Sequence, residues 1–176
     1  YNNPGWTINE QDNPNDVDRF TITPQLDWNI SENLTLTSRY GLDYYTDHRE
    51  YFFPVNSAAG LRTGFYAQTD LKEKTENFNT FLRSSHKLNE NLNLGFILGL
   101  TLDRNQYSLL GGSSEQFTNP AVDDLRIFGN ANAENETIGN FKREARKSGG
   151  YFIFNMDAYD QLYFEASARY ERSSTF

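Results

Sequence analysis

The sequence predicts an all-β fold: an antiparallel, up-and-down transmembrane β-barrel segment of about six strands, arranged as three hairpins. The first observation is the stretch at residues 92–103, LNLGFILGLTLD, in which leucine or phenylalanine occupies every second position. A period of two is that of a strand with one apolar and one polar face, because a helix would scatter these residues around its surface. The second observation is that a hairpin pattern repeats along the chain, and the third is that its connections differ in length between the two ends.

Composition narrows the class of protein. The chain has 176 residues, a net charge of −8 and 15% aromatic residues, which suits one domain without the basic footprint of a nucleic-acid-binding protein. No run of about 18 apolar residues predicts a transmembrane helix, although barrel strands score weakly on hydropathy and are not excluded. The absence of cysteine excludes a disulfide scaffold and Cys-ligated zinc. The first residues form no basic, apolar leader, so we expect any export signal to lie outside this sequence.

The elements follow one another in a regular order. Residues 1–16 are rich in Asn, Pro and Asp and predict a loop. Alternation then predicts six strands, at residues 17–30, 34–47, 77–88, 92–104, 149–158 and 162–173. The connections within each pair of strands are short, with the sequences ISEN, LNEN and AYDQ, whereas long polar segments at about 48–76 and 105–148 separate the pairs.

The short connections repeat one another. Alignment of residues 28–34, 86–92 and 156–162 gives the same order of an acidic residue, an amide and a leucine. Hairpins with short turns at one end and long loops at the other are typical of outer-membrane barrels, which have short periplasmic turns and long extracellular loops. We therefore expect segments 48–76 and 105–148 to be extracellular loops.

The two faces of the predicted strands differ in charge. Even-numbered positions are mostly apolar or aromatic and none carries a formal charge, whereas the charged residues fall on odd positions. A charge facing lipid costs about 2–4 kcal/mol near the bilayer midplane, while a watery lumen tolerates it. Pro24 is an exception because it removes a ladder donor. Six strands cannot close, so the chain would be an arc of a larger barrel.

Several short motifs resemble one family. The chain opens with Asn3-Pro4 and Trp6, followed by DVDRF at residues 16–20, and YGLDYYTD occupies residues 40–47. Residues 167–176, SARYERSSTF, are similar to an arginine-then-DGSS-x-F segment, with Glu-Arg in place of Asp-Gly. In this order, the motifs resemble the SusC/RagA-type TonB-dependent outer-membrane transporters over nearly the whole chain.

The resemblance implies a 22-stranded barrel in the bacterial cell outer membrane, of which this chain is a middle portion without the N-terminal plug domain. It implies import of nutrients such as glycan oligosaccharides or peptides, energised by the TonB–ExbB–ExbD complex. It also implies a SusD-like surface lipoprotein as partner. From the residues alone, two alternatives stay open: a passive porin-like outer-membrane barrel, and a soluble secreted β-sandwich that binds glycans and buries its apolar face as a core.

No catalytic, metal-binding or cofactor-binding constellation is present in the sequence, so we predict a protein that is not an enzyme. Candidate substrate-binding residues are aromatic residues of the long segments, since aromatic faces stack on sugar rings: Tyr51, Phe52, Phe53, Phe65, Tyr66, Phe117 and Phe128. Packing of the loops on one another is the alternative explanation for these rings. Candidate lumen- or plug-facing residues are the charged residues of the odd face: Arg39, Asp43, Arg83, Asp103, Glu165 and Arg169.

Overall fold

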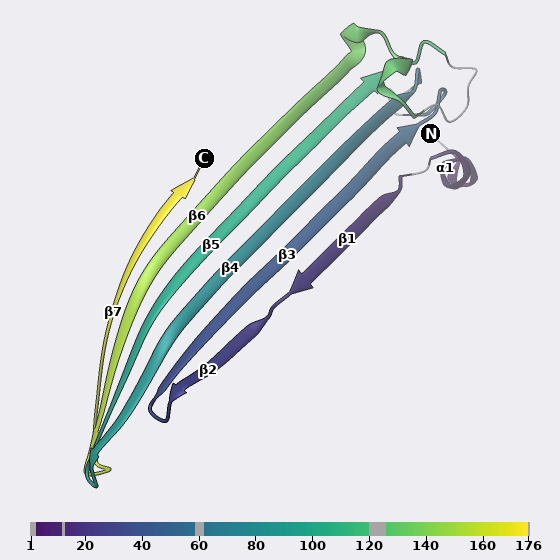
Figure 1. Ribbon diagram of the computed structural model, residues 1–176. Coiled ribbons are helices and arrows are strands. Elements are labelled where there is room, and N and C mark those ends of the chain that lie inside the picture. Colours follow the sequence, from purple (N-terminus) through teal and green to yellow (C-terminus); the bar gives the residue numbers. More distant parts are fainter. Residues whose placement is uncertain (1–2, 12, 59–61, 120–125, 176) are drawn as a thin grey trace. The chain divides into compact units, whose positions relative to one another are not determined.

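The computed structural model describes residues 3–11, 13–58, 62–119 and 126–175 and confirms the all-β prediction. Seven strands form one antiparallel sheet in the order β1-β3-β4-β5-β6-β7, and β2 also pairs with β3 (Figure 1). The strands are β1 (Asn15–Ile22), β2 (Gln25–Ser31), β3 (Leu34–Phe53), β4 (Phe65–Asn89), β5 (Leu92–Glu115), β6 (Glu136–Ala158) and β7 (Leu162–Thr175).

Two expected elements differ from the prediction. The single strand expected at 17–30 is divided into β1 and β2 at Pro24, which has no N–H to donate to the sheet. The carbonyl of Pro24 still accepts a hydrogen bond from the Tyr40 N–H at 3.0 Å. The loop expected at 1–16 contains a helix, α1 (Pro4–Glu10), in which the Asn3 side chain caps the Gly5 N–H and proline occupies the first turn.

The long connections are shorter than expected. Strands β3 and β4 extend to Phe53 and from Phe65, so their connection covers 54–64 instead of 48–76. Strand β5 extends to Glu115 and β6 begins at Glu136, with two short helices between them, η1 (Phe128–Asn130) and η2 (Ala133–Asn135). The connections within the three hairpins are tight, as predicted, and in the last of them Tyr159 and Asp160 adopt positive φ.

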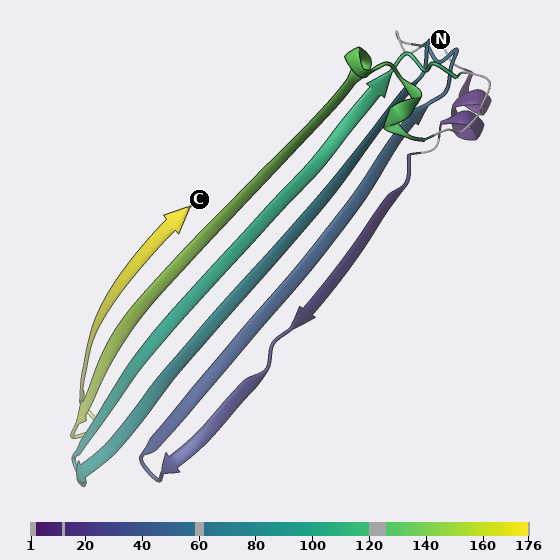
Figure 2. The same ribbon diagram turned by 45° about the horizontal axis from the view of Figure 1, so that its top comes forward.

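The chain divides into two compact units. The loop unit comprises Tyr1–Arg19, Tyr45–Glu73 and Tyr107–Lys142, and the turn unit comprises Phe20–Tyr44, Lys74–Gln106 and Arg143–Phe176. In the turn unit the three tight turns lie at the same end of the strands (Figures 1 and 2). In the loop unit, α1 and the two long connections lie at the strand ends (Figure 2).

Within the turn unit, register keeps the faces of neighbouring strands in phase. Trp28 lies opposite Leu36 in one strand pair and Phe154 opposite Ala166 in another, so even positions face the same side of the sheet. Ring contacts join the strands on this even face, with Phe96 at 5.2 Å from Phe154. The predicted separation of an apolar and a charged face is therefore present in the sheet.

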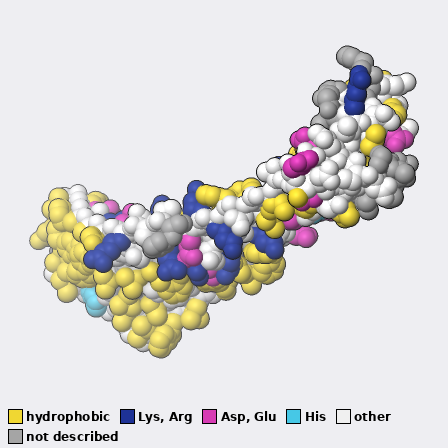
Figure 3. Space-filling model, turned by 90° about the horizontal axis from the view of Figure 1, so that it is seen from above, with side chains coloured by type: hydrophobic (Ala, Val, Ile, Leu, Met, Phe, Trp, Pro, Cys, Tyr) yellow, Lys and Arg dark blue, Asp and Glu magenta, His cyan; other side chains and the backbone are white. Residues whose placement is uncertain are grey.

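No second layer of the described chain covers the even face of the turn unit. Leu98, Leu100 and Leu102 are 60%, 57% and 53% exposed. Among the described residues of this unit, Ala158 is the one buried hydrophobic side chain. Figure 3 shows hydrophobic side chains gathered at the surface beside Lys and Arg. A soluble β-sandwich packs its apolar face against a second sheet, and this face has no such sheet over it.

Candidate functional site

The loop unit contains a cluster of aromatic side chains drawn from strand ends and a connection. Tyr51, Phe52 and Phe53 lie at the end of β3, and Phe65 and Tyr66 at the beginning of β4, so these five are strand residues rather than loop residues. Three ring pairs, listed with the distances between their centroids, hold the cluster together: Phe52–Phe117 (6.0 Å), Phe53–Phe65 (6.0 Å) and Tyr66–Phe128 (5.3 Å).

The rings of this cluster differ in exposure. Phe52 is 5% exposed and Tyr66 is 2% exposed, so their faces contact other protein side chains. Phe52 and Phe117 stack nearly parallel, at an interplanar angle of 13°. Tyr51 is 44% exposed and offers a ring to solvent. The structure thus brings the predicted aromatic residues together, with mutual packing as the main role of the buried ones.

A hydrogen-bonded group of polar side chains lies beside these rings. The His48 Nδ1 atom is 2.7 Å from Asp70 Oδ1, and its Nε2 atom is 3.2 Å from Glu50 Oε1. The hydrogen bond with Asp70, followed by that with Glu50, raises the pKa of His48 above its ordinary value despite some burial. Arg126 connects the group to the aromatic cluster, since it lies 3.6 Å from Glu50 and over the Phe52 ring.

A buried carboxylate lies on the opposite parity of β3. Asp47 is 2% exposed and accepts hydrogen bonds from the Arg49 guanidinium and from the Tyr45 hydroxyl, the latter at 2.8 Å. The bonds with Arg49 lower the pKa of Asp47. Sequence analysis did not identify this group, although its i, i+2 spacing on one strand places all three side chains on the same face.

The candidate lumen residues lie on the odd face of the turn unit, as their numbering predicts. The Arg39 Nε atom donates to Gln25 Oε1 at 2.7 Å, and Asp43 accepts from the Thr21 hydroxyl at 3.1 Å. Asp103 accepts from the Asn77 amide at 2.7 Å. These bonds join neighbouring strands, so each of the three polar side chains stabilises strand pairing on that face.

The other three candidates are on the same face but are not gathered into one cluster with the first three. Arg83 lies over the Phe81 ring at 5.8 Å, and Glu165 is opposite Asn155 in the β6–β7 pair. Arg169 forms an ion pair with Glu171 on its own strand. The odd face is thus a polar wall with charges of both signs, rather than a pocket with converging groups.

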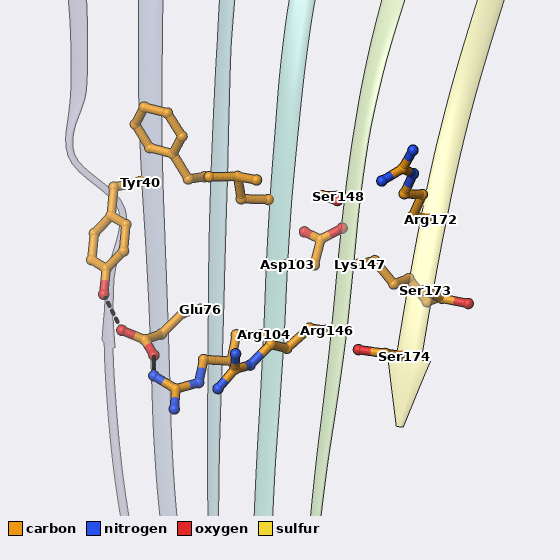
Figure 4. Close-up of a pocket in the computed structure, with 12 residues that line it drawn as sticks. Tyr40, Glu76, Asp103, Arg104, Arg146, Lys147, Ser148, Arg172, Ser173 and Ser174 are labelled. Atoms are coloured by element: carbon orange, nitrogen blue, oxygen red, sulfur yellow. Dashed lines mark hydrogen bonds and ion pairs between the residues drawn. The ribbon is translucent and has the colours of Figure 1, made fainter. Parts of the chain in front are cut away.

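A group of ionic residues on the even face of the turn unit was missed by sequence analysis. The Tyr40 hydroxyl donates to Glu76 at 2.9 Å, and Arg104 Nη1 is 3.9 Å from the same carboxylate (Figure 4). Arg104 also donates to Glu144 at 2.9 Å, and Arg146 pairs with Glu144. The even numbering of all four charged residues was the available signal, but the long polar segments were interpreted as loops.

Other features bear on cofactor and membrane chemistry. Among the described residues, no group of three or more His, Cys, Asp or Glu side chains is arranged to hold a metal ion. In the described part of the chain, no helix combines the length and apolar character needed to cross a membrane.

Comparisons with known proteins identify similar folds. No family model and no curated protein matches the chain. The structure of the RagAB peptide transporter superposes with a TM-score of 0.86 at 14% identity, covering 96% of this chain and 19% of that one. The RagAB peptide importer matches in its "open-open" state, with TM-score 0.85 and 15% identity, and in its "closed-closed" state, with 0.86 and 14%. Each of these matches covers 97% of this chain and 19% of the other.

The fold is that of a transporter segment. The resemblance to SusC/RagA-type transporters recognised from sequence motifs is therefore confirmed at the level of the fold. The chain spans about a fifth of the length of the solved chains that it matches.

Proposed function

We propose that this chain is a strand segment of an active outer-membrane importer of the SusC/RagA type. The observation that carries the proposal is the uncharged, uncovered even face of the turn unit. On β5 this face runs from Leu92 to Leu102 without a charge, and about 9–11 residues of tilted strand cross a bilayer. Lipid is the environment that satisfies such a face, while the odd face, with Arg39 and Asp103, borders water.

The transported substrate is a nutrient such as an oligosaccharide or a peptide. Peptide transport is the function named for the RagAB structures that share the fold. In this proposal the plug domain of the longer protein contacts charged residues of the odd face, and TonB with ExbB–ExbD supplies energy through that plug. The aromatic cluster of the loop unit shapes the substrate surface, with the exposed ring of Tyr51 as the contact residue, and a SusD-like lipoprotein covers the entrance.

Spin labels on the full-length protein in bilayers test the membrane orientation. Labels at Leu36, Leu94 and Leu98 should be accessible to oxygen dissolved in lipid and shielded from a water-soluble nickel complex. Labels at Thr37 and Ile97 provide matched controls on the opposite face and should show the reverse preference. Burial of the leucine labels against protein, with neither reagent gaining access, would contradict the proposal.

Growth and uptake measurements test active import. Deletion of the gene should abolish growth on either peptides or oligosaccharides as the nutrient source, and the wild-type gene should restore it. Deletion of TonB should abolish uptake to the same extent, because the energy source is removed. Uptake that continues without TonB would identify a passive porin, and a protein found in the soluble periplasmic fraction would identify a secreted binding module.

A further inference from the structure

The even face of the turn unit changes from apolar to ionic within two residues along β5. Leu98, Leu100 and Leu102 are followed at the same parity by Arg104. Arg104 belongs to the ionic group formed with Glu76, Glu144 and Arg146. If the face meets lipid, this group lies where hydrocarbon gives way to head groups, because the apolar stretch that starts at the Leu92 turn ends there.

A cavity of about 660 Å³ lies at this transition. Phe78 and Leu102 give it an apolar part, and Arg104, Arg146 and Arg172 give it a cationic part (Figure 4). All five residues have even numbers, and all belong to the turn unit. The cavity therefore combines surface for an acyl chain with surface for an anion, the two chemical parts of an acidic lipid.

The arginine side chains are held in position with donors to spare. Glu144 accepts from Arg104 at 2.9 Å and also pairs with the Nε atom of Arg146. The Nε atom of Arg172 donates to the Tyr170 hydroxyl at 2.7 Å, and its guanidinium lies over that ring. Within the described residues, the terminal nitrogens of Arg146 and Arg172 have no protein partner. Planar guanidinium groups bind phosphate through two parallel N–H donors, so these nitrogens suit a phosphate.

We propose that this cavity binds the phosphate head group of an acidic lipid in the outer leaflet, with the acyl chains along Phe78 and Leu102. The proposal rests on the membrane orientation given under Proposed function. A free phosphate ion uses only the arginines, whereas a phospholipid or glycolipid phosphate also uses the apolar floor. Commitment to a lipid follows from the adjacency of the two.

Native mass spectrometry of the full-length protein in neutral detergent tests this site. The delipidated protein is mixed with equal amounts of phosphatidic acid and phosphatidylcholine that carry the same acyl chains. Wild type should retain phosphatidic acid preferentially. The double variant Arg104→Gln/Arg146→Gln should lose about 25-fold of that preference, since each basic residue near an acidic lipid contributes about fivefold. The single variant Arg172→Gln, remote from the Glu144 ion pairs, should lose about fivefold.

Matched controls separate the site from net charge. Arg83→Gln/Arg169→Gln removes the same charge from the odd face and should leave the preference unchanged. Arg104→Lys/Arg146→Lys should retain most of it, which also shows that the ionic group tolerates substitution. Equal losses in the even-face and odd-face glutamine variants would overturn the proposal, as would displacement of the lipid by excess inorganic phosphate. A protein absent from the outer-membrane fraction would instead overturn the function proposed above.

Discussion

The two units of the chain treat their apolar side chains in opposite ways. In the loop unit, Phe52 and Tyr66 are buried, and Phe117 and Phe128 from the connection after β5 cover them. In the turn unit, Leu98 and its even neighbours are more than half exposed. Since about 25 cal/mol is gained for each Å² of apolar surface removed from water, the bare face has stability only where another apolar medium covers it. One unit thus buries rings against its own chain, while the other requires lipid.

The largest expected effect comes from a charge on the bare face. Leu98→Arg in the full-length protein should destabilise the inserted state by about 2–4 kcal/mol, because the side chain would lie near the bilayer midplane. The amount of protein in the outer membrane and the urea midpoint in bilayers measure the effect. Ile97→Arg, one residue away on the odd face, is the matched control and should be inserted normally. Equal loss for both variants would show that the two faces have similar surroundings.

The next effect concerns the buried rings of the loop unit. Phe52→Ala removes a side chain that stacks on Phe117 and supports Arg126, and we expect a loss of about 3 kcal/mol in local stability. Hydrogen exchange at the end of β3 and limited proteolysis after β5 measure this loss. Tyr51→Ala truncates an exposed neighbour and should change protection little. A similar response to both substitutions would contradict the contrast in burial.

Sequence predicted the turn unit better than the loop unit, for a physical reason. Alternation is strong only where the two faces of a strand meet different media, as in residues 92–102. Strand β5 continues to Glu115 through polar residues of both parities, where no periodic pattern distinguishes strand from loop. The short helix α1 gave no periodicity either, although the Asn3-Pro4 pair is a helix-start pattern.

The missed ionic group has a different cause. Glu76, Arg104 and Glu144 are far apart in sequence and on three strands, and their contacts depend on the register between those strands. Register follows from pairing along whole strands, which the expected boundaries had cut short. Pro24, in contrast, was recognisable as an exception from its chemistry alone, and it divides β1 from β2.

A smaller effect is expected at a close approach on the odd face of the turn unit. A Cβ atom added to Gly99 would lie 2.1 Å from the Tyr151 Cζ atom, so the ring packs directly on the glycine. Gly99→Ala should cost about 1–2 kcal/mol as the ring moves away. Gly95→Ala, where the nearest atom is 3.6 Å away, is the control. Urea unfolding in bilayers measures both, and Tyr151→Ala should remove most of the Gly99→Ala penalty if the ring is its cause.

The smallest effect is a pH dependence of the loop unit. The hydrogen bonds of His48 with Asp70 and Glu50 raise its pKa in the folded state. Their stabilisation is therefore fully present below the unfolded value of about 6.5 and is lost as pH rises through the raised folded pKa. The pair is partly exposed, so we expect a change below about 1 kcal/mol.

Amide exchange at the ends of β3 and β4 measures this change. Protection in wild type should fall across that pH range, and His48→Gln should show no such fall because glutamine does not titrate. His86→Gln, at the other histidine, pairs with Ser84 near a turn in the turn unit and should behave as wild type in the loop unit. A fall that persists in His48→Gln would assign the pH dependence to another group, and would leave the buried rings as the main stabilising element of the loop unit.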